Sequence, residues 1–231
     1  MLRNRTISLK VVERVALALE EIKDEVIFVG GATLSLYVTD KGAEQPRPTT
    51  DIDVSVQVST YGEMEHLRER LAAKRFHPAI SEEVLYRYRF QDILIDFIPI
   101  EATELGPTNK WLKPGFQVAE HVSIGATSIK ILPVGLFLAS KWEAFKSRGG
   151  DPRSSHDFED IVYTIDNNLE VVNSVAMAGD DVISFLSGMA QEILEHPHRN
   201  EIVECHINLY TAAVRRGIVL EKLEAISAMG R

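Results

Sequence analysis

The sequence predicts an α+β fold in which a mixed β-sheet with flanking helices is followed by a helical region. Short runs rich in valine and isoleucine, bounded by glycine or polar residues, precede Pro133 and are typical of strands. After Pro133 the apolar residues recur instead at the spacing of helices. We therefore divide the chain into a sheet-containing domain, residues 1–132, and a helical domain, residues 133–231.

The first domain is expected to alternate helices with strands. Gly42, Pro46 and Pro48 make residues 41–50 a loop. The dipeptide Gln91-Asp92 separates two apolar runs and predicts an antiparallel hairpin. The expected helices are residues 9–22, 32–38 and 61–74, and the expected strands are residues 26–31, 51–58, 84–90 and 93–100, with one or two weaker strands within 118–131.

The second domain is expected to consist of helices. Gly149 and Gly150 end its first helix, and Asp151 with Pro152 is typical of the N-cap and first residue of the next. The expected helices are residues 134–146, 153–165, 170–175, 180–195, 200–215 and 219–229.

The composition restricts the class of protein. Hydrophobic residues make up 45% of the 231 residues, as in an ordinary globular protein. No apolar run reaches the ~20 residues of a membrane span, and the N-terminus lacks the apolar core of a signal peptide. The single cysteine, Cys205, excludes an internal disulfide and is typical of a reducing compartment. We therefore expect a cytoplasmic protein without a membrane partner.

The net charge of −9 is unevenly distributed. From Asp151 to Arg231 there are 14 acidic and 6 basic residues, whereas residues 1–150 contain 20 and 19. The acidic part therefore disfavours nucleic-acid binding by bulk electrostatics, and a polyanionic substrate requires a local basic surface in the first part. The candidates for that surface are Arg68, Arg70, Lys74, Arg75, Lys110 and Lys113.

Asp51 and Asp53 interrupt a run of isoleucine and valine that predicts a strand. Because side chains alternate along a strand, both carboxylates point to one face while Ile52 and Val54 point to the other. Carboxylates at this spacing lie roughly 6–7 Å apart by strand rise and repel each other unless a cation compensates them. A hard divalent ion such as Mg²⁺ prefers oxygen ligands and meets this need. The alternative is an exposed strand edge with solvated carboxylates.

A third carboxylate, Asp96, lies in an otherwise apolar predicted strand, where a buried charge needs a partner. If this strand lies beside that of the aspartate pair, three carboxylates converge. Such a set can hold two metal ions, the arrangement that serves phosphoryl and nucleotidyl transfer. The alternative is a buried salt bridge from Asp96 to Arg87 or Arg89 on the hairpin partner.

The pair Gly30-Gly31 follows a predicted strand and precedes a predicted helix. Glycines there let backbone N–H groups approach a phosphate, and the start of a helix adds favourable partial charge. Thr33 can add a hydroxyl. A glycine pair, a helix, a strand with two alternate aspartates and a later lone aspartate form a far more specific pattern than the glycines alone.

This pattern resembles the nucleotidyltransferase superfamily of DNA polymerase β type, whose signature is hG[GS], a spacer, then [DE]h[DE]h, and a distal carboxylate on another strand. The spacer between Gly31 and Asp51 has 19 residues, longer than is usual in the superfamily. The phrase RPTTDIDV is similar to one common in bacterial members. The segment ASKWEAFKSRGGDPRSSHDFEDI resembles the lysine helix and following aspartate helix of AbiEii/MenA-like nucleotidyltransferase toxins. The resemblance covers roughly residues 26–165.

The resemblance implies roles for individual residues. Asp51, Asp53 and Asp96 would bind Mg²⁺ in a two-ion site where Mn²⁺ can substitute. The catalytic set would also include Lys141, whose point charge suits the β- and γ-phosphates, and Asp157. The residues expected to bind the nucleotide are Gly30, Gly31, Thr33, Arg47, Lys141 and Asp160.

The second domain is expected to complete the nucleotide cleft, with Lys141 and Asp157 approaching from its side. Asp157 and Asp160 match the acidic pair on the second helix, and Asp157 is expected to contact Lys141, the base or the ribose. Arg148 is a candidate partner of this acidic pair. The alternatives are structural. Lys141 would be a surface lysine with a packed stem, Asp157 would stabilise a first helical turn together with Ser154, and Arg47 would be a solvated loop residue.

The implied reaction is attack of an acceptor hydroxyl on the α-phosphate of an NTP, with release of pyrophosphate. A toxin-like enzyme acting on RNA, such as tRNA, with an antitoxin protein as partner, is the first expectation. The alternatives are modification of an aminoglycoside-like small molecule or of a protein hydroxyl, and a nucleotide-binding module without turnover. The three carboxylates argue against the last. The NTP, the acceptor and the oligomeric state stay open.

Overall fold

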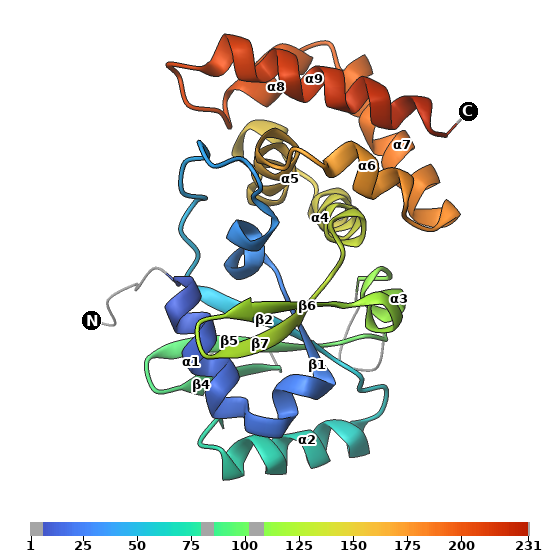
Figure 1. Ribbon diagram of the computed structural model, residues 1–231. Coiled ribbons are helices and arrows are strands. Elements are labelled where there is room, and N and C mark those ends of the chain that lie inside the picture. The colour runs from blue at the N-terminus through green and yellow to red at the C-terminus, as the bar shows by residue number, and fades with distance from the viewer. Residues whose placement is uncertain (1–6, 80–85, 102–108, 231) are drawn as a thin grey trace. The chain divides into compact units, whose positions relative to one another are not determined.

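The computed structural model describes residues 7–79, 86–101 and 109–230, which form two compact units. The sheet unit comprises Met1–Thr33 and Arg47–Leu132, and the helical unit comprises Leu34–Pro46 and Pro133–Arg231. Figure 1 shows both units. None of the described helices is long and apolar enough to cross a membrane.

The sheet unit contains a mixed sheet, as the sequence predicts. In its described part the strand order is β3-β4-β5-β2-β1-β7-β6. The pairs β2–β5 and β1–β7 are parallel and the others are antiparallel. The strands are β1 Val26–Val29, β2 Asp51–Val56, β3 His77–Pro78, β4 Arg87–Phe90, β5 Ile93–Pro99, β6 Glu120–Ile124 and β7 Thr127–Ile131.

Helices flank this sheet (Figure 1). α1 packs on β6 and β7. α2 begins at a capping box in which the Thr60 hydroxyl accepts from the Glu63 amide and the Glu63 carboxylate accepts from the Thr60 amide. After α2, Phe76 packs on Phe90 and Phe97 and closes the apolar core on that side. The helices are α1 Leu9–Leu19, α2 Tyr61–Ala73 and α3 Leu112–Val118, with 3₁₀ helices η1 Glu20–Glu25 and η2 Gly31–Tyr37.

Several details of this unit differ from the sequence-based prediction. The first helix ends at Leu19 because Glu20 has a φ of 51°, and the chain continues as η1. The helix expected at residues 32–38 is a 3₁₀ helix. The short β3 and α3 were not expected. The hairpin strand expected at 84–90 is described from Arg87, and residues 80–85 lie outside the described part.

The helical unit is built on the antiparallel pair α4 and α5, against which α7 and α9 pack. Gly149, with a φ of 66°, ends α4 as predicted. Asp151 caps the 3₁₀ helix η3, whereas Ser155 caps α5 by accepting from the Phe158 amide, which corrects the expected role of Ser154. The helices are α4 Val134–Arg148, η3 Pro152–Ser154, α5 His156–Asn167, α6 Val171–Ala176, α7 Asp180–Glu195, α8 Arg199–Glu204 and α9 Ala212–Ala228.

The continuous helix expected at residues 200–215 is wrong, because α8 and α9 are separated by a turn. In this turn the Asn208 side chain accepts from the Tyr210 amide, and the Asn208 carbonyl accepts from Thr211. His206 Nε2 lies 2.8 Å from the Pro152 carbonyl oxygen. The hydrogen bonds of Asn208 thus stabilise a turn in place of a continuous helix.

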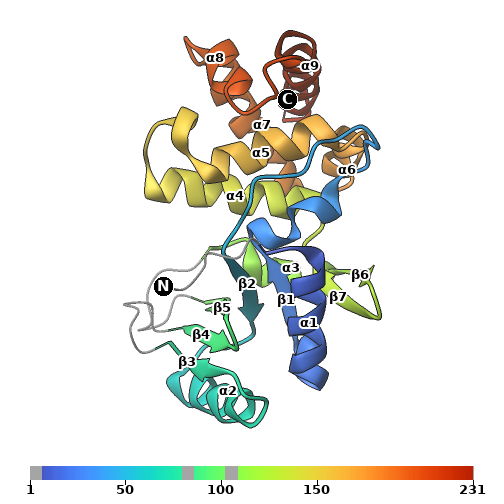
Figure 2. The ribbon, with the colours of Figure 1, turned by 90° about the vertical axis from the view of Figure 1, so that its left-hand side faces the viewer.

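The first part of the loop expected at residues 41–50 belongs to the helical unit, and its last four residues belong to the sheet unit. We call Leu34–Pro46 the linking segment. Thr39 and Asp40 donate their amides to the Asn167 carbonyl at the end of α5, and the Tyr163 hydroxyl donates to the Glu44 carbonyl. Figure 2 shows this segment running beside α5. The sequence-based division had placed these residues in the first domain.

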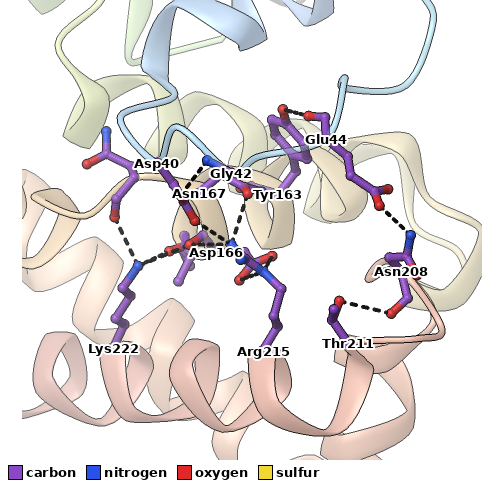
Figure 3. Close-up of polar contacts among 12 residues, drawn as sticks. Asp40, Gly42, Glu44, Tyr163, Asp166, Asn167, Asn208, Thr211, Arg215 and Lys222 are labelled. Carbon is purple, nitrogen blue, oxygen red and sulfur yellow. Dashed lines mark hydrogen bonds and ion pairs between the residues drawn. The ribbon is translucent and has the colours of Figure 1, made fainter.

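Arg215 on α9 anchors the linking segment to α5 (Figure 3). Its guanidinium lies 2.7 Å from an Asp166 carboxylate oxygen and 3.1 Å from one of Asp40. The Gly42 amide and then Arg215 lower the pKa of Asp40, so this carboxylate stays charged. Lys222 donates to three carbonyls at the C-terminal end of α5, including that of Asn168, and burial lowers its pKa.

Replacing Arg215 with glutamine removes this cation and leaves the Asp166 carboxylate largely buried without its ion pair. We expect the free energy of unfolding to fall by about 2 kcal/mol. We also expect the amide hydrogens of Thr39 and Asp40 to exchange faster, because the linking segment opens more often. Urea unfolding and hydrogen–deuterium exchange measure these two effects.

Arg153 provides the matched control. It pairs with Asp151 and Glu201 in the same unit, but both of these carboxylates are exposed and neither belongs to the linking segment. Arg153→Gln is expected to change stability much less and to leave exchange at Thr39 and Asp40 as in the wild type. Unchanged exchange at both amides in R215Q would contradict the anchor.

Candidate active site

The predicted carboxylates lie on neighbouring strands of the sheet. In the parallel pair β2–β5, Asp53 lies directly opposite Asp96, and in the antiparallel pair β4–β5, Arg87 lies opposite Asp96. Residues opposite each other share a face, and Asp51 shares it because it is two residues from Asp53. The three carboxylates and one guanidinium therefore form a row across one face. We call these four residues the carboxylate row.

The other face of the same strands is apolar. Ile52, Val54, Ile95 and Phe97 alternate with the aspartates and are buried. Slipping the strand by one residue would exchange the two faces, so the buried apolar set fixes the register that keeps the carboxylates together.

Arg87 joins two of the carboxylates. Its Nε and Nη2 lie 2.7 and 2.8 Å from the two Asp96 oxygens, and Nη2 also lies 3.3 Å from Asp51 Oδ2. The Asp96 side chain is only 10% exposed and therefore needs such a partner. The salt bridge considered as the alternative for Asp96 is thus present. This salt bridge is compatible with a metal role for Asp96, because it places a cation where the negative charges of Asp51 and Asp96 need one.

The glycine turn lies against Asp53. Gly30 has a φ of 73°, and a Cβ at this position would lie 1.9 Å from Asp53 Oδ2. Both facts require glycine. A Cβ on Gly31 would lie 3.1 Å from Arg47 Nη2, so the Arg47 guanidinium lies over this turn. Thr49 donates its hydroxyl to Asp51 Oδ1 at 3.2 Å.

Thr33 lies inside the turn. Its side chain is fully buried, and its hydroxyl donates to the Gly30 carbonyl at 3.0 Å. The adjoining helix is the short 3₁₀ helix η2, so the dipole argument made for an α-helix does not apply here. Contacts to a phosphate would come from the half-buried backbone of Gly30 and Gly31 and from Arg47.

The candidate ligands in the carboxylate row are all carboxylate oxygens, which are the ligands that hard divalent ions prefer. Arg87 marks a cation position between Asp51 and Asp96. Across the described ranges, no three histidine, cysteine or carboxylate side chains are already arranged to hold a metal ion. The three aspartates fit Mg²⁺ by their chemistry, provided that the guanidinium yields its position.

A second charged cluster lies within the helical unit. Lys141 on α4 extends to α5, where its Nζ lies 2.8 Å from Asp160 Oδ2 and 3.3 Å from Asp157 Oδ1. Arg148 Nη1 lies 2.5 Å from Asp157 Oδ2. Asp157 and Asp160 reach one side of α5 because residues three apart on a helix are neighbours. The expected contacts of Lys141 and Arg148 with this acidic pair are therefore present.

Burial distinguishes Lys141 from a surface lysine. Its side chain is 11% exposed, and that of Asp160 is fully buried. A buried lysine here lies beside two buried carboxylates of opposite charge, and the cost of desolvating these groups makes the cluster sensitive to the loss of either partner. The assignment of these residues to nucleotide binding stays a prediction.

Arg87 is the one member of the carboxylate row that the sequence indicates only as a possible salt-bridge partner of Asp96. The sequence nevertheless contains a signal for its position. A two-residue turn at Gln91-Asp92 pairs Phe90 with Ile93, and the same antiparallel register then pairs Arg87 with Asp96.

Gly30→Ala tests the close approach of Asp53. The added Cβ meets Asp53 Oδ2 and the backbone must keep a positive φ, so we expect a loss of about 2 kcal/mol or more in stability. Gly62→Ala, in α2 where a Cβ meets nothing within 4 Å, is the control and is expected to be neutral or stabilising. Chemical unfolding compares the two. Equal stability of G30A and wild type would contradict the geometry.

Lys141→Ala tests the buried cluster. It leaves Asp157 and Asp160 without this cation, and we expect a loss of about 3 kcal/mol. Adding Asp160→Asn removes one uncompensated charge and should recover part of it. Lys146 lies on α4, as Lys141 does, and forms an exposed ion pair with Glu192 on α7. Lys146→Ala should therefore cost under about 1 kcal/mol. Similar losses for K141A and K146A in urea unfolding would contradict this account.

Comparisons with known proteins agree with the class that the motifs indicate. The model of the family described as "Nucleotidyl transferase AbiEii toxin, Type IV TA system" matches residues 13–183, a range that includes the carboxylate row, the glycine turn and the Lys141 cluster. No curated protein matches the chain.

Two solved structures are similar to the chain at low identity. The antigenic nucleotidyltransferase-like protein from Paracoccidioides brasiliensis is 15% identical over 88% of this chain and 95% of its own, with a TM-score of 0.49. JHP933 from Helicobacter pylori is 10% identical over 96% of this chain and 93% of its own, with a TM-score of 0.41. Since the family model covers more than half of the sequence, the chain belongs to the AbiEii nucleotidyl transferase toxin family.

Proposed function

We propose that this protein is a Mg²⁺-dependent nucleotidyltransferase that moves NMP from an NTP to an acceptor hydroxyl and releases pyrophosphate in the cytoplasm. The observation that carries this proposal is the carboxylate row, in which Asp53 and Asp96 lie in register on one face beside the Gly30 turn. Membership of a nucleotidyl transferase family supports the reaction class.

In this proposal Asp51, Asp53 and Asp96 hold Mg²⁺, and Mn²⁺ can replace it. When bound, the ion neutralises charge on the α-phosphate and orients the oxygens that attack and leave. The backbone of the Gly30 turn and the Arg47 guanidinium bind phosphate oxygens. The acceptor oxygen bonds to the α-phosphorus, the bond to the β-phosphate oxygen breaks, and a carboxylate takes the hydroxyl proton.

The helical unit supplies the second set of groups in this proposal. Lys141 provides a point charge for the β- and γ-phosphates, and Asp157 and Asp160 hold its ammonium in place. Arg148 has a side chain that is 72% exposed, so it can exchange Asp157 for a ligand group at little cost. The family description as a toxin of a Type IV TA system supports an antitoxin protein as partner.

The acceptor is proposed to be RNA, such as tRNA, but the basic surface expected for it is largely neutralised. Arg70 on α2 pairs with Glu25, and Lys74, directly after α2, pairs with Glu20 and Glu21. Among the other expected members, Arg68 pairs with Glu65 and Lys113 with Glu101. This observation favours a second candidate, a small hydroxyl-bearing acceptor such as an aminoglycoside, whose positive charge would suit the acidic chain.

Labelled nucleotides test the reaction. Each NTP, carrying label at the α- or the γ-phosphate, is incubated with the protein, Mg²⁺ and either total tRNA, aminoglycosides or protein. We expect α-label to enter one acceptor class and γ-label to appear in pyrophosphate. Asp53→Asn should abolish both, because it removes a charge of the carboxylate row. Asp92→Asn, in the exposed hairpin turn, is the control and should leave transfer unchanged.

The outcomes separate the alternatives. Label in tRNA supports the toxin-type acceptor, whereas label in aminoglycoside supports the small-molecule acceptor. Transfer of γ-label to the acceptor would indicate a kinase and contradict the proposal. Transfer of α-label that persists at the wild-type rate in D53N would contradict the assignment of the site.

A further inference from the structure

Arg87 has a position that the proposed metal site does not explain by itself. Its guanidinium takes both oxygens of Asp96 and one oxygen of Asp51. These are two of the three proposed metal ligands. The Arg87 side chain is 19% exposed and that of Asp51 is 29% exposed, so water competes weakly for this contact.

A divalent ion and this guanidinium compete for the same carboxylates. Each Asp96 oxygen already accepts a hydrogen bond from Arg87, at 2.7 and 2.8 Å, so an ion bound to these oxygens would lie close to the guanidinium. Two cations on the same oxygens repel each other strongly in a partly buried site. Arg87 cannot avoid the conflict by losing its proton, because arginine stays charged in proteins. We therefore expect the guanidinium to move when a metal ion binds Asp96.

We propose that Arg87 is an intrinsic competitor of the metal ion: it holds Asp51 and Asp96 in the free protein and releases them when the metal binds. This inference rests on the proposed function. Arg87 acts as a positioning residue, because it compensates part of the negative charge of Asp51 and Asp96 while no ion is present and sets how tightly a free ion binds. A nucleotide that brings phosphate oxygens offers the released guanidinium a new bidentate partner.

The competition has a measurable consequence. The apparent affinity of the metal equals the intrinsic affinity multiplied by the fraction of time in which the carboxylates are free of Arg87. Removing the guanidinium raises that fraction, so metal binding should become tighter. If the Arg87–Asp96 salt bridge were purely structural, removing Arg87 would instead weaken metal binding, because the Asp96 carboxylate would no longer be held in position.

The test uses the full chain without nucleotide and measures binding of Mn²⁺ by the electron paramagnetic resonance of the free ion. Arg87→Gln is expected to bind Mn²⁺ about tenfold more tightly than the wild type. Arg89→Gln is the matched control. It removes the same charge two residues along β4 and on the same face, yet Arg89 lies opposite Leu94 rather than Asp96. It should change the affinity by less than about twofold.

Arg87→Lys keeps a cation for Asp96 and carries the test if R87Q does not fold. A lysine is a point charge without the bidentate fork, so its affinity for Mn²⁺ should lie between those of the wild type and R87Q. An unchanged or weaker affinity in R87Q, or in R87K where R87Q does not fold, would overturn the inference. An equal gain in R89Q would also overturn it, by showing a general charge effect.

Asp96→Asn separates failure of this inference from failure of the proposed function. If D96N loses Mn²⁺ binding while R87Q binds as the wild type does, the metal site stands and the competition is wrong. If neither the wild type nor the Arg87 variants bind Mn²⁺, the proposed metal site fails and the inference fails with it.

Discussion

The repulsion among three carboxylates on one face of a sheet is the constraint on which the site depends. Asp51, Asp53 and Asp96 are brought together by the pairing of β2 with β5. Like charges this close require a cation or a rise in pKa. The structure meets the requirement with the Arg87 guanidinium, which bonds Asp96 in a bidentate manner and also reaches Asp51.

The surrounding residues follow from this constraint. The apolar alternate residues of β2 and β5 bury the opposite face and so prevent a slip in register that would separate the carboxylates. Gly30 leaves room for the Asp53 carboxylate where any other residue would place a Cβ. The proposed metal site therefore also contains a cation, Arg87, that compensates part of its negative charge.

In the helical unit, two further pairs of carboxylates are each compensated by one cation. Lys141 compensates Asp157 and Asp160 between α4 and α5. Arg215 compensates Asp166 and Asp40, and thereby fastens the linking segment. This segment leaves the sheet unit directly after the Gly30–Thr33 turn and returns at Arg47, shortly before Asp51. Both halves of the proposed nucleotide motif are therefore covalently continuous with a segment that the helical unit holds.

Local pattern was sufficient to predict the fold class and the three carboxylates that share one face of the sheet. The strand alternation around Asp53 and the lone Asp96 indicated shared faces, and the lysine and aspartate helices were found at the expected positions. Contacts distant in sequence could not be predicted in this way. The linking segment is bound by residues of α5 and α9, and the basic side chains of Arg70 and Lys74 are neutralised by glutamates from residues 20–25.

The central claim is that the carboxylate row is a cation site from which Arg87 is displaced. Its most direct measurement is the anomalous diffraction of Mn²⁺ in crystals of the full chain grown with a non-hydrolysable NTP analogue. The account predicts a peak within bonding distance of Asp51, Asp53 and Asp96, with the Arg87 guanidinium turned away from Asp96. A nucleotide-bound structure with no peak there, or with the Arg87–Asp96 pair intact beside the metal, would contradict it.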